Sequence, residues 1–143
     1  MKGFVLDNSV AMRWLLGSEK RTDQIYAERV LMSLADATAF VPNLWHLEAA
    51  NVLRGAERSQ EIEIGETEQF ISQLENLPIQ VDLLTANKAF SRTLALARAY
   101  NLSSYDASYL ELALREGLPL ATLDKDLKKA ALKAKVEIYL SAE

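Results

Sequence analysis

The stretch FVLDNSVA, residues 4–11, runs from strand-forming residues into an acid. Residues 3–6 have the continuous apolar character of a strand buried on both faces, as the central strands of parallel sheets are. Asp7 stands where this strand would end. Because the carboxyl ends of parallel strands line the reactive crevice of an open sheet, Asp7 is a candidate for chemistry as well as for the N-cap of a following helix.

The composition is that of a globular protein. The chain has 143 residues, 50% apolar and 25% charged, and this length predicts one domain spanning residues 1–143. The absence of cysteine excludes disulfides, thiolate metal sites and a cysteine nucleophile. No signal-peptide core and no apolar run of membrane-spanning length occurs, so we expect a cytoplasmic protein without membrane contact.

The charge pattern is uneven. A net charge of −4 argues against binding nucleic acid through the whole surface. Residues 124–135 nevertheless carry five lysines against two aspartates. This excess is typical of a solvated helix whose cations lie near its C-terminal end, and that interpretation is preferred to a dedicated RNA contact.

Strand and helix patterns alternate along the chain. Strand-like runs occur at residues 3–6, 38–41, 79–83, 118–123 and 136–140. The segments between them place apolar residues at the i, i+3, i+4 and i+7 spacing of amphipathic helices. Strands separated by helices imply parallel crossovers. The sequence therefore predicts an α/β sandwich with a mostly parallel sheet of about five strands flanked by helices, the first strand central and the last at an edge.

Acidic residues follow more than one of these strands. Asp124 comes directly after residues 118–123, and Asp126 follows two residues later. Each has a structural explanation, since Asp7 and Asp124 are good N-cap residues. Asp106 likewise stands three residues after a serine, in the spacing of a capping box.

Glu48 is harder to explain as a cap. Pro42 and Asn43 predict a helix start, which places Glu48 about two turns inside the helix. Neither of the residues three and four positions ahead, Asn51 and Val52, is basic. Because a carboxylate on a largely apolar helix is costly to bury alone, a metal ion or a distant basic residue is the expected partner.

Other catalytic groups are missing from the sequence. The single histidine, His46, is interpreted as a surface or packing residue. No nucleophile elbow, P-loop or dinucleotide-binding glycine motif occurs, which excludes the usual serine hydrolases, nucleotide kinases and dinucleotide enzymes. A haloacid-dehalogenase-like phosphatase also begins with a strand ending in Asp, but it needs an acid where Ser9 stands. Acidic residues are the chemical cluster that is left.

The order of these motifs along the whole chain resembles the PIN-domain ribonucleases, and specifically the VapC-type toxins of toxin–antitoxin pairs. The matching segments are FVLDNSV, with Asp7 and Ser9; WHLEAANVL, with Glu48 and Asn51; LSSYDASYLELA, with Asp106; and LPLATLDKDL, with Thr122, Asp124 and the accessory Asp126. Asn8 is a departure, because Thr, Ala or Ser is more usual there.

The resemblance implies a PIN-like three-layer sandwich and a Mg²⁺- or Mn²⁺-dependent endoribonuclease. It implies that the catalytic residues and metal ligands are Asp7, Glu48, Asp106 and Asp124, with Ser9, Asn51, Thr122 and Asp126 accessory. A structured RNA such as transfer or ribosomal RNA, a cognate antitoxin and a second copy of the chain are the implied partners. Candidate phosphate contacts are Arg13, Arg54, Arg58 and the lysines of the last predicted helix, within residues 124–135. Attack by a water that the metal activates predicts a 5′-phosphate product.

Two other interpretations stay open. One is a catalytically inactive PIN-like module kept for protein contact, which would normally have lost one or more of the four acids. The other is a structural domain whose aspartates are caps, and Glu48 is the residue that it does not explain.

Overall fold

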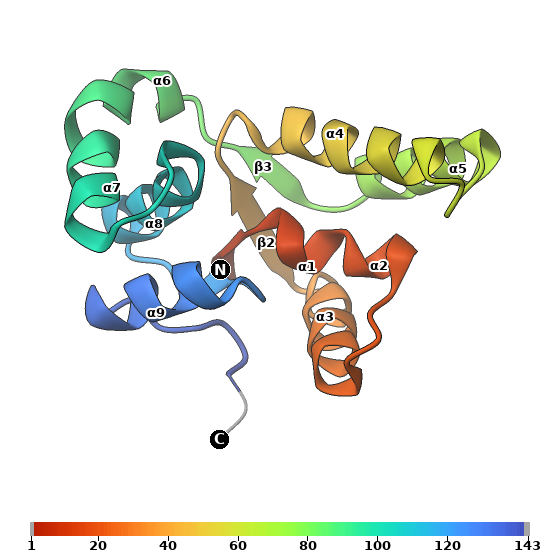
Figure 1. Ribbon diagram of the computed structural model, residues 1–143. Helices are drawn as coiled ribbons and strands as arrows, with labels where there is room; N and C mark the ends of the chain where they lie inside the picture. The colour runs from red at the N-terminus through yellow and green to blue at the C-terminus, as the bar shows by residue number, and fades with distance from the viewer. Residues whose placement is uncertain (1, 142–143) are drawn as a thin grey trace.

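A parallel sheet organises the computed structural model, which describes residues 2–141 (Figure 1). Within these residues the sheet has four strands in the order β3-β2-β1-β4, and every pairing is parallel. The strands are β1 (Lys2–Leu6), β2 (Ala37–Val41), β3 (Ile79–Val81) and β4 (Leu120–Ala121). The predicted α/β fold, with the first strand inside the sheet, is confirmed.

The predicted fifth strand, residues 136–140, does not form a continuous strand. Residues 136–140 contribute only an isolated parallel bridge, between Ile138 and Leu120. The backbone has positive φ at both ends of the segment, 65° at Lys135 and 51° at Leu140, so an extended strand cannot continue there. The segment still lies beside β4 at the sheet edge, where Tyr139 stacks on Phe4 with ring centroids 3.9 Å apart.

Helices fill the connections between the strands. They are α1 (Asn8–Ala11), α2 (Arg13–Leu16), α3 (Arg21–Ser33), α4 (Trp45–Arg58), α5 (Ile64–Glu75), α6 (Thr85–Lys88), the π-helix η1 (Ala89–Thr93), α7 (Leu94–Tyr100), α8 (Ser104–Glu116) and α9 (Lys125–Lys133). Figure 1 shows α7, α8 and α9 on one side of the sheet and α1, α2 and α3 on the other, with α4 and α5 projecting as a pair. No helix within residues 2–141 is long and apolar enough to span a membrane.

The core explains the apolar character of β1. Phe4, Val5 and Leu6 are completely buried, because α8 packs against the strand and both strand edges are paired. Close packing also fixes Gly3, where a Cβ atom would stand 2.9 Å from the Phe40 ring. The strand is thus held rigidly, and it delivers Asp7 to the carboxyl edge of the sheet.

Candidate active site

Asp7 and Asp124 occupy the N-cap positions of α1 and α9. Asp7 directly follows β1, and Asp124 stands three residues after the end of β4. Their backbones have the extended conformation that N-caps adopt, but neither side chain makes a capping hydrogen bond. The structural explanation of these two acids as caps therefore accounts for their backbone positions and not for their carboxylates.

Asp7 is anchored through one oxygen only. Its Oδ2 accepts hydrogen bonds from Ser9 Oγ at 2.6 Å and from Thr122 Oγ1 at 2.7 Å. Ser9 Oγ in turn accepts from the backbone N–H of Leu123 at 2.9 Å, which ties the ends of β1 and β4 together. Oδ1 of Asp7 has no hydrogen-bond partner within residues 2–141.

Burial dominates the ionisation of Asp7, whose side chain is only 6% exposed. The pKa of Asp7 rises from 3.8 to about 6. Burial is the largest cause, the hydrogen bonds from Ser9 and Thr122 lower the pKa, and the charges of Asp106 and Glu48 add to the rise. Among residues 2–141 no basic side chain forms an ion pair with Asp7. The carboxylate is held in an environment that disfavours its charge.

Glu48 lies closer to its helix start than predicted. Helix α4 begins at Trp45, whose N–H donates to Pro42 O at 3.0 Å across a turn, so Glu48 stands in the first turn and not two turns inside. Its side chain nevertheless does not cap the helix. Glu48 Oε1 accepts hydrogen bonds from Tyr109 Oη at 2.5 Å and from Asn8 Nδ2 at 3.3 Å. Of the two expected partners, a metal ion or a distant basic residue, the basic residue is wrong for residues 2–141, where two neutral donors hold this carboxylate.

Asn8 and Tyr109 are site residues that sequence reasoning missed. Asn8 Nδ2 also donates to Trp45 O at 3.0 Å, which joins α1 to the start of α4, and Asn8 Oδ1 is buried without a hydrogen-bond partner among residues 2–141. Burial, then the charges of Asp7 and Glu48, raise the pKa of Tyr109, so its hydroxyl remains a donor. The available signal was spacing, because Tyr109 follows Asp106 by three residues and lies on the same helix face.

Asp106 brings a fourth element, α8, to the same edge. Its backbone N–H donates to Ser103 Oγ at 3.0 Å, which confirms the predicted serine cap. Burial raises the pKa of Asp106, and the charges of Asp124, Glu48 and Asp126 raise it further. The acids predicted to act together therefore do share one electrostatic environment.

The acids do not converge on one point. Within the described residues, no three carboxylate or histidine side chains are placed to coordinate a common ion. The kind of ligand atom nevertheless fits a hard divalent cation, because the side chains of Asp7, Glu48, Asp106 and Asp124 offer only oxygen atoms. None of the four forms an ion pair with a basic side chain within residues 2–141.

The other predicted residues lie apart from these contacts. Asn51 is exposed on α4 and makes no side-chain hydrogen bond within residues 2–141. Arg13 donates to Gly17 O at 2.6 Å, Arg54 pairs with Glu57 at 3.4 Å, and Arg58 is exposed. His46 is exposed and sets its ring against Trp45 with centroids 5.0 Å apart, as expected of a surface residue.

A parallel sheet whose carboxyl edge gathers acids from four elements defines a class of α/β protein with a candidate acidic active site. The family model of the PIN domain matches residues 4–133, so the chain belongs to the PIN domain family, which is generally a nuclease fold. The crystal structure of PAE2754 from Pyrobaculum aerophilum has the same fold, with a TM-score of 0.64 and 20% identity over 90% of this chain and 86% of that chain. A comparison with curated protein sequences gives no match.

Proposed function

We propose that this protein is a Mg²⁺- or Mn²⁺-dependent endoribonuclease that hydrolyses phosphodiester bonds of RNA. The observation that carries the proposal is the set of carboxylates at the sheet edge, Asp7, Glu48, Asp106 and Asp124, none of which pairs with a cation within residues 2–141. The neighbouring acids raise the pKa of Asp7 and of Asp106, and neutral donors hold Asp7 and Glu48. Neighbouring carboxylates without basic partners repel one another, which costs the folded state free energy. A bound cation would relieve that repulsion.

The same four residues would hold the cation. When bound, a divalent cation would offset the repulsion among the carboxylates and make a water molecule more acidic for attack on a phosphodiester. Carboxylate ligands select Mg²⁺ or Mn²⁺ over zinc, which favours nitrogen and sulfur.

The protein's own part is orientation. Ser9 and Thr122 fix Asp7 by Oδ2, while Asn8 and Tyr109 fix Glu48 by Oε1. In each acid the second oxygen has no partner within residues 2–141. Hydrogen bonds of this kind fix the orientation of a ligand, and their removal weakens metal sites.

The substrate and partners follow from the resemblance to VapC-type toxins. We propose transfer or ribosomal RNA as the substrate, a homodimer as the active form and a small antitoxin as the inhibitor. A basic antitoxin side chain would pair with Glu48 and Asp106, neither of which has a cation partner within residues 2–141. A short neighbouring reading frame encoding a DNA-binding segment with a polar tail would support this role.

An RNA cleavage assay tests the proposal. Purified transfer and ribosomal RNA are incubated with the wild-type protein and with Asp7→Asn, in Mg²⁺, in Mn²⁺ and in EDTA. The matched control is Asp36→Asn, because Asp36 is exposed and directly precedes β2, at the opposite edge of the sheet. We expect cleavage with a divalent cation by the wild type and by the control, and a loss of at least about 10³-fold in Asp7→Asn.

Several outcomes would contradict the proposal. Equal cleavage by Asp7→Asn would place the activity elsewhere or in a contaminant. A 2′,3′-cyclic phosphate on the products would exclude water as the nucleophile. No cleavage by the wild type under any condition would favour the alternative, a catalytically inactive PIN-like module that binds protein.

A further inference from the structure

A polar hollow of about 390 Å³ lies between the end of α7 and the outer face of α9. We call it the α7–α9 hollow, and the residues of its wall that matter here are Tyr100, Asn101, Asp126, Lys129 and Lys133. Its volume is within the range of pockets that hold small molecules, and a nucleotide is of this size. Figure 1 shows α7 and α9 on the same side of the sheet.

Two unpaired cations stand in its wall. Lys129 and Lys133 are four residues apart on α9, so their side chains project from one face of the helix. Both are exposed, and neither forms an ion pair within residues 2–141. Asp126 also lines the hollow but pairs with neither lysine. Two ammonium groups against one carboxylate make the hollow attractive to an anion.

The opposite wall offers groups that suit a base. Tyr100 is half-buried and packs against the hydrophobic core, so its ring has little freedom. Asn101 ends α7 in the left-handed conformation, φ 54° and ψ 50°, and its side-chain amide makes no hydrogen bond within residues 2–141. An aromatic face, an amide and neighbouring cations are the groups by which proteins hold single-stranded RNA.

The hollow adjoins the acidic edge. Helix α9 begins directly after Asp124, and Asp126, one of the hollow's own residues, acts electrostatically on Asp106. At the rise of an α-helix, Lys129 stands roughly 7 Å beyond Asp124 along the helix axis and Lys133 roughly 13 Å beyond it. A strand of RNA leaving the carboxylates along α9 would pass these lysines in turn.

We propose that the α7–α9 hollow is a subsite for a nucleotide of the RNA that flanks the scissile phosphodiester, with Lys129 and Lys133 binding phosphate and Tyr100 stacking on a base. This inference rests on the proposed ribonuclease function. In this proposal the RNA runs along α9 and not along Arg54 and Arg58, which lie in the later turns of α4.

Binding without cleavage tests the subsite. In an Asp7→Asn background, the affinity for a fluorescein-labelled single-stranded 12-nucleotide RNA of mixed sequence is measured by anisotropy across a series of KCl concentrations. Lys129→Gln with Lys133→Gln is compared with Lys128→Gln with Lys135→Gln. The second pair removes the same charge, and its lysines line two other hollows.

We expect the first pair to weaken binding by at least about tenfold and to lower the salt slope by about 1.4, the value for two phosphates of a single strand. The control pair should weaken binding by less than about threefold. Tyr100→Leu should weaken binding by about fivefold or more without changing the slope, because stacking releases no counterions. Circular dichroism checks that each variant is folded.

The failure of this inference is distinguishable from the failure of the proposed function. Equal losses from both lysine pairs would show a general charge effect and overturn the subsite, as would no loss or no measurable binding. If the wild type cleaves RNA and the Lys129 and Lys133 pair is neutral, the subsite alone fails. If the wild type never cleaves and this pair still controls RNA binding, the ribonuclease proposal alone fails.

Discussion

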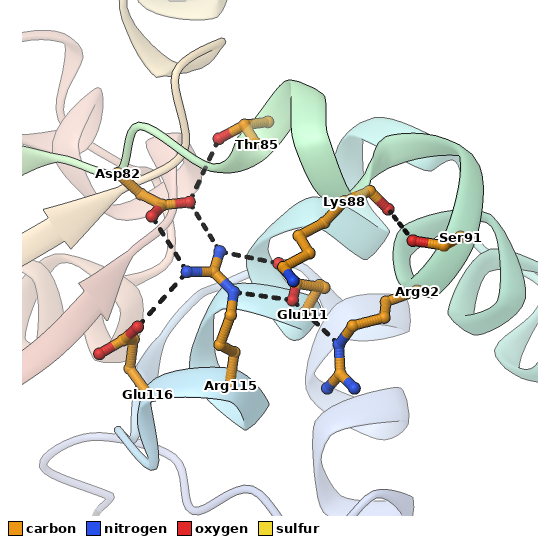
Figure 2. Close-up of polar contacts among 8 residues, drawn as sticks. All are labelled: Asp82, Thr85, Lys88, Ser91, Arg92, Glu111, Arg115 and Glu116. Atoms are coloured by element: carbon orange, nitrogen blue, oxygen red, sulfur yellow. Dashed lines mark hydrogen bonds and ion pairs between the residues drawn. The ribbon is translucent and has the colours of Figure 1, made fainter.

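Two groups of acids in this molecule differ in their counter-charges. At the carboxyl edge, Asp7 and Asp106 have no basic partner within residues 2–141. On the other side of α8, Asp82 and Glu111 surround Arg115 (Figure 2). The guanidinium donates to both oxygens of Asp82, at 3.1 and 2.7 Å, and to both oxygens of Glu111, at 2.9 Å each.

The pKa values diverge accordingly. Burial tends to raise the pKa of Asp82, but hydrogen bonds and charge from Arg115 more than offset it, and the pKa falls below its usual value. Burial also raises the pKa of Asp7 and of Asp106, and there the neighbouring charges are acids and raise it further. In the Arg115 network each carboxylate has a basic partner, and the network joins the end of β3 to α8, whereas the edge carboxylates have no basic partner within residues 2–141.

Removing the Arg115 cation should have the largest effect on stability. Arg115→Met keeps most of the side-chain volume and leaves Glu111, which is 2% exposed, with a single contact to the half-exposed Arg92 at 3.2 Å in place of its forked partner. We expect the free energy of unfolding at pH 7 to fall by about 3–5 kcal/mol, as when one partner of a buried ion pair is lost. Urea denaturation measures it.

A second variant keeps this prediction specific to charge. Adding Asp82→Asn and Glu111→Gln to Arg115→Met removes the uncompensated carboxylates, so it should recover part of the loss. A loss below about 1 kcal/mol in Arg115→Met would mean that solvent reaches these acids, and that the two groups of carboxylates do not differ as described.

Asp7→Asn should act in the opposite direction. The amide oxygen can still accept from Ser9 and Thr122, while the charge that burial disfavours is gone. Since the pKa of Asp7 is about 6 in the folded protein and 3.8 as its ordinary value, the folded state binds the proton more strongly. We expect a gain of roughly 2–3 kcal/mol at pH 7 in EDTA.

The pH dependence gives this gain a signature. Between about pH 4 and pH 6 the folded state holds more protons than the unfolded state, so this group's contribution to stability falls as the pH rises and then levels off. The difference in the free energy of unfolding between Asp7→Asn and the wild type should therefore increase from about pH 4 to about pH 6. Urea denaturation at several pH values measures it, and a constant difference from pH 4 to pH 8 would contradict the prediction.

Local patterns along the chain were sufficient for most of the fold. The apolar residues of β1 and the helix spacing between strands predicted a parallel sheet, and Ser103 predicted the start of α8. The segment at residues 136–140 has strand-like alternation, but positive φ at Lys135 and at Leu140 ends it, and neither residue is a glycine that would have signalled such a turn.

The contacts that define the site were less predictable, because they join residues far apart in the sequence. Asn8 and Tyr109 reach Glu48 across 40 and 61 positions, and Arg115 reaches Asp82 across 33. The sequence places Tyr109 on the helix face of Asp106, but nothing local indicates that its hydroxyl reaches Glu48. Glu48 could be recognised in the sequence as an acid without a local basic partner. The neutral groups that donate to it could be identified only from the structure.

Those neutral groups provide a smaller test of the comparison. Tyr109→Phe removes one of the two donors to Glu48 Oε1 and leaves the ring in place. In a double-mutant cycle with Glu48→Ala in EDTA, we expect a coupling energy of about 1–2 kcal/mol, within the range measured for side chains in one hydrogen-bond network. Urea denaturation measures all four proteins. Strictly additive losses would mean that Tyr109 stabilises only through its packing.

The smallest effect should come from an ion pair that lies in solvent. The side chain of Arg54 is 58% exposed and contacts Glu57 at 3.4 Å, a single contact where Arg115 makes several. Because water screens the pair and the arginine is free to move, Arg54→Ala should change the free energy of unfolding by less than about 0.5 kcal/mol. A loss comparable with that of Arg115→Met would mean that pairing alone stabilises this fold. A large loss in Arg115→Met and a small one in Arg54→Ala would instead show that burial decides how much an ion pair contributes to stability. Burial makes an unpaired acid costly at the carboxyl edge, and it strengthens the paired acids of the Arg115 network.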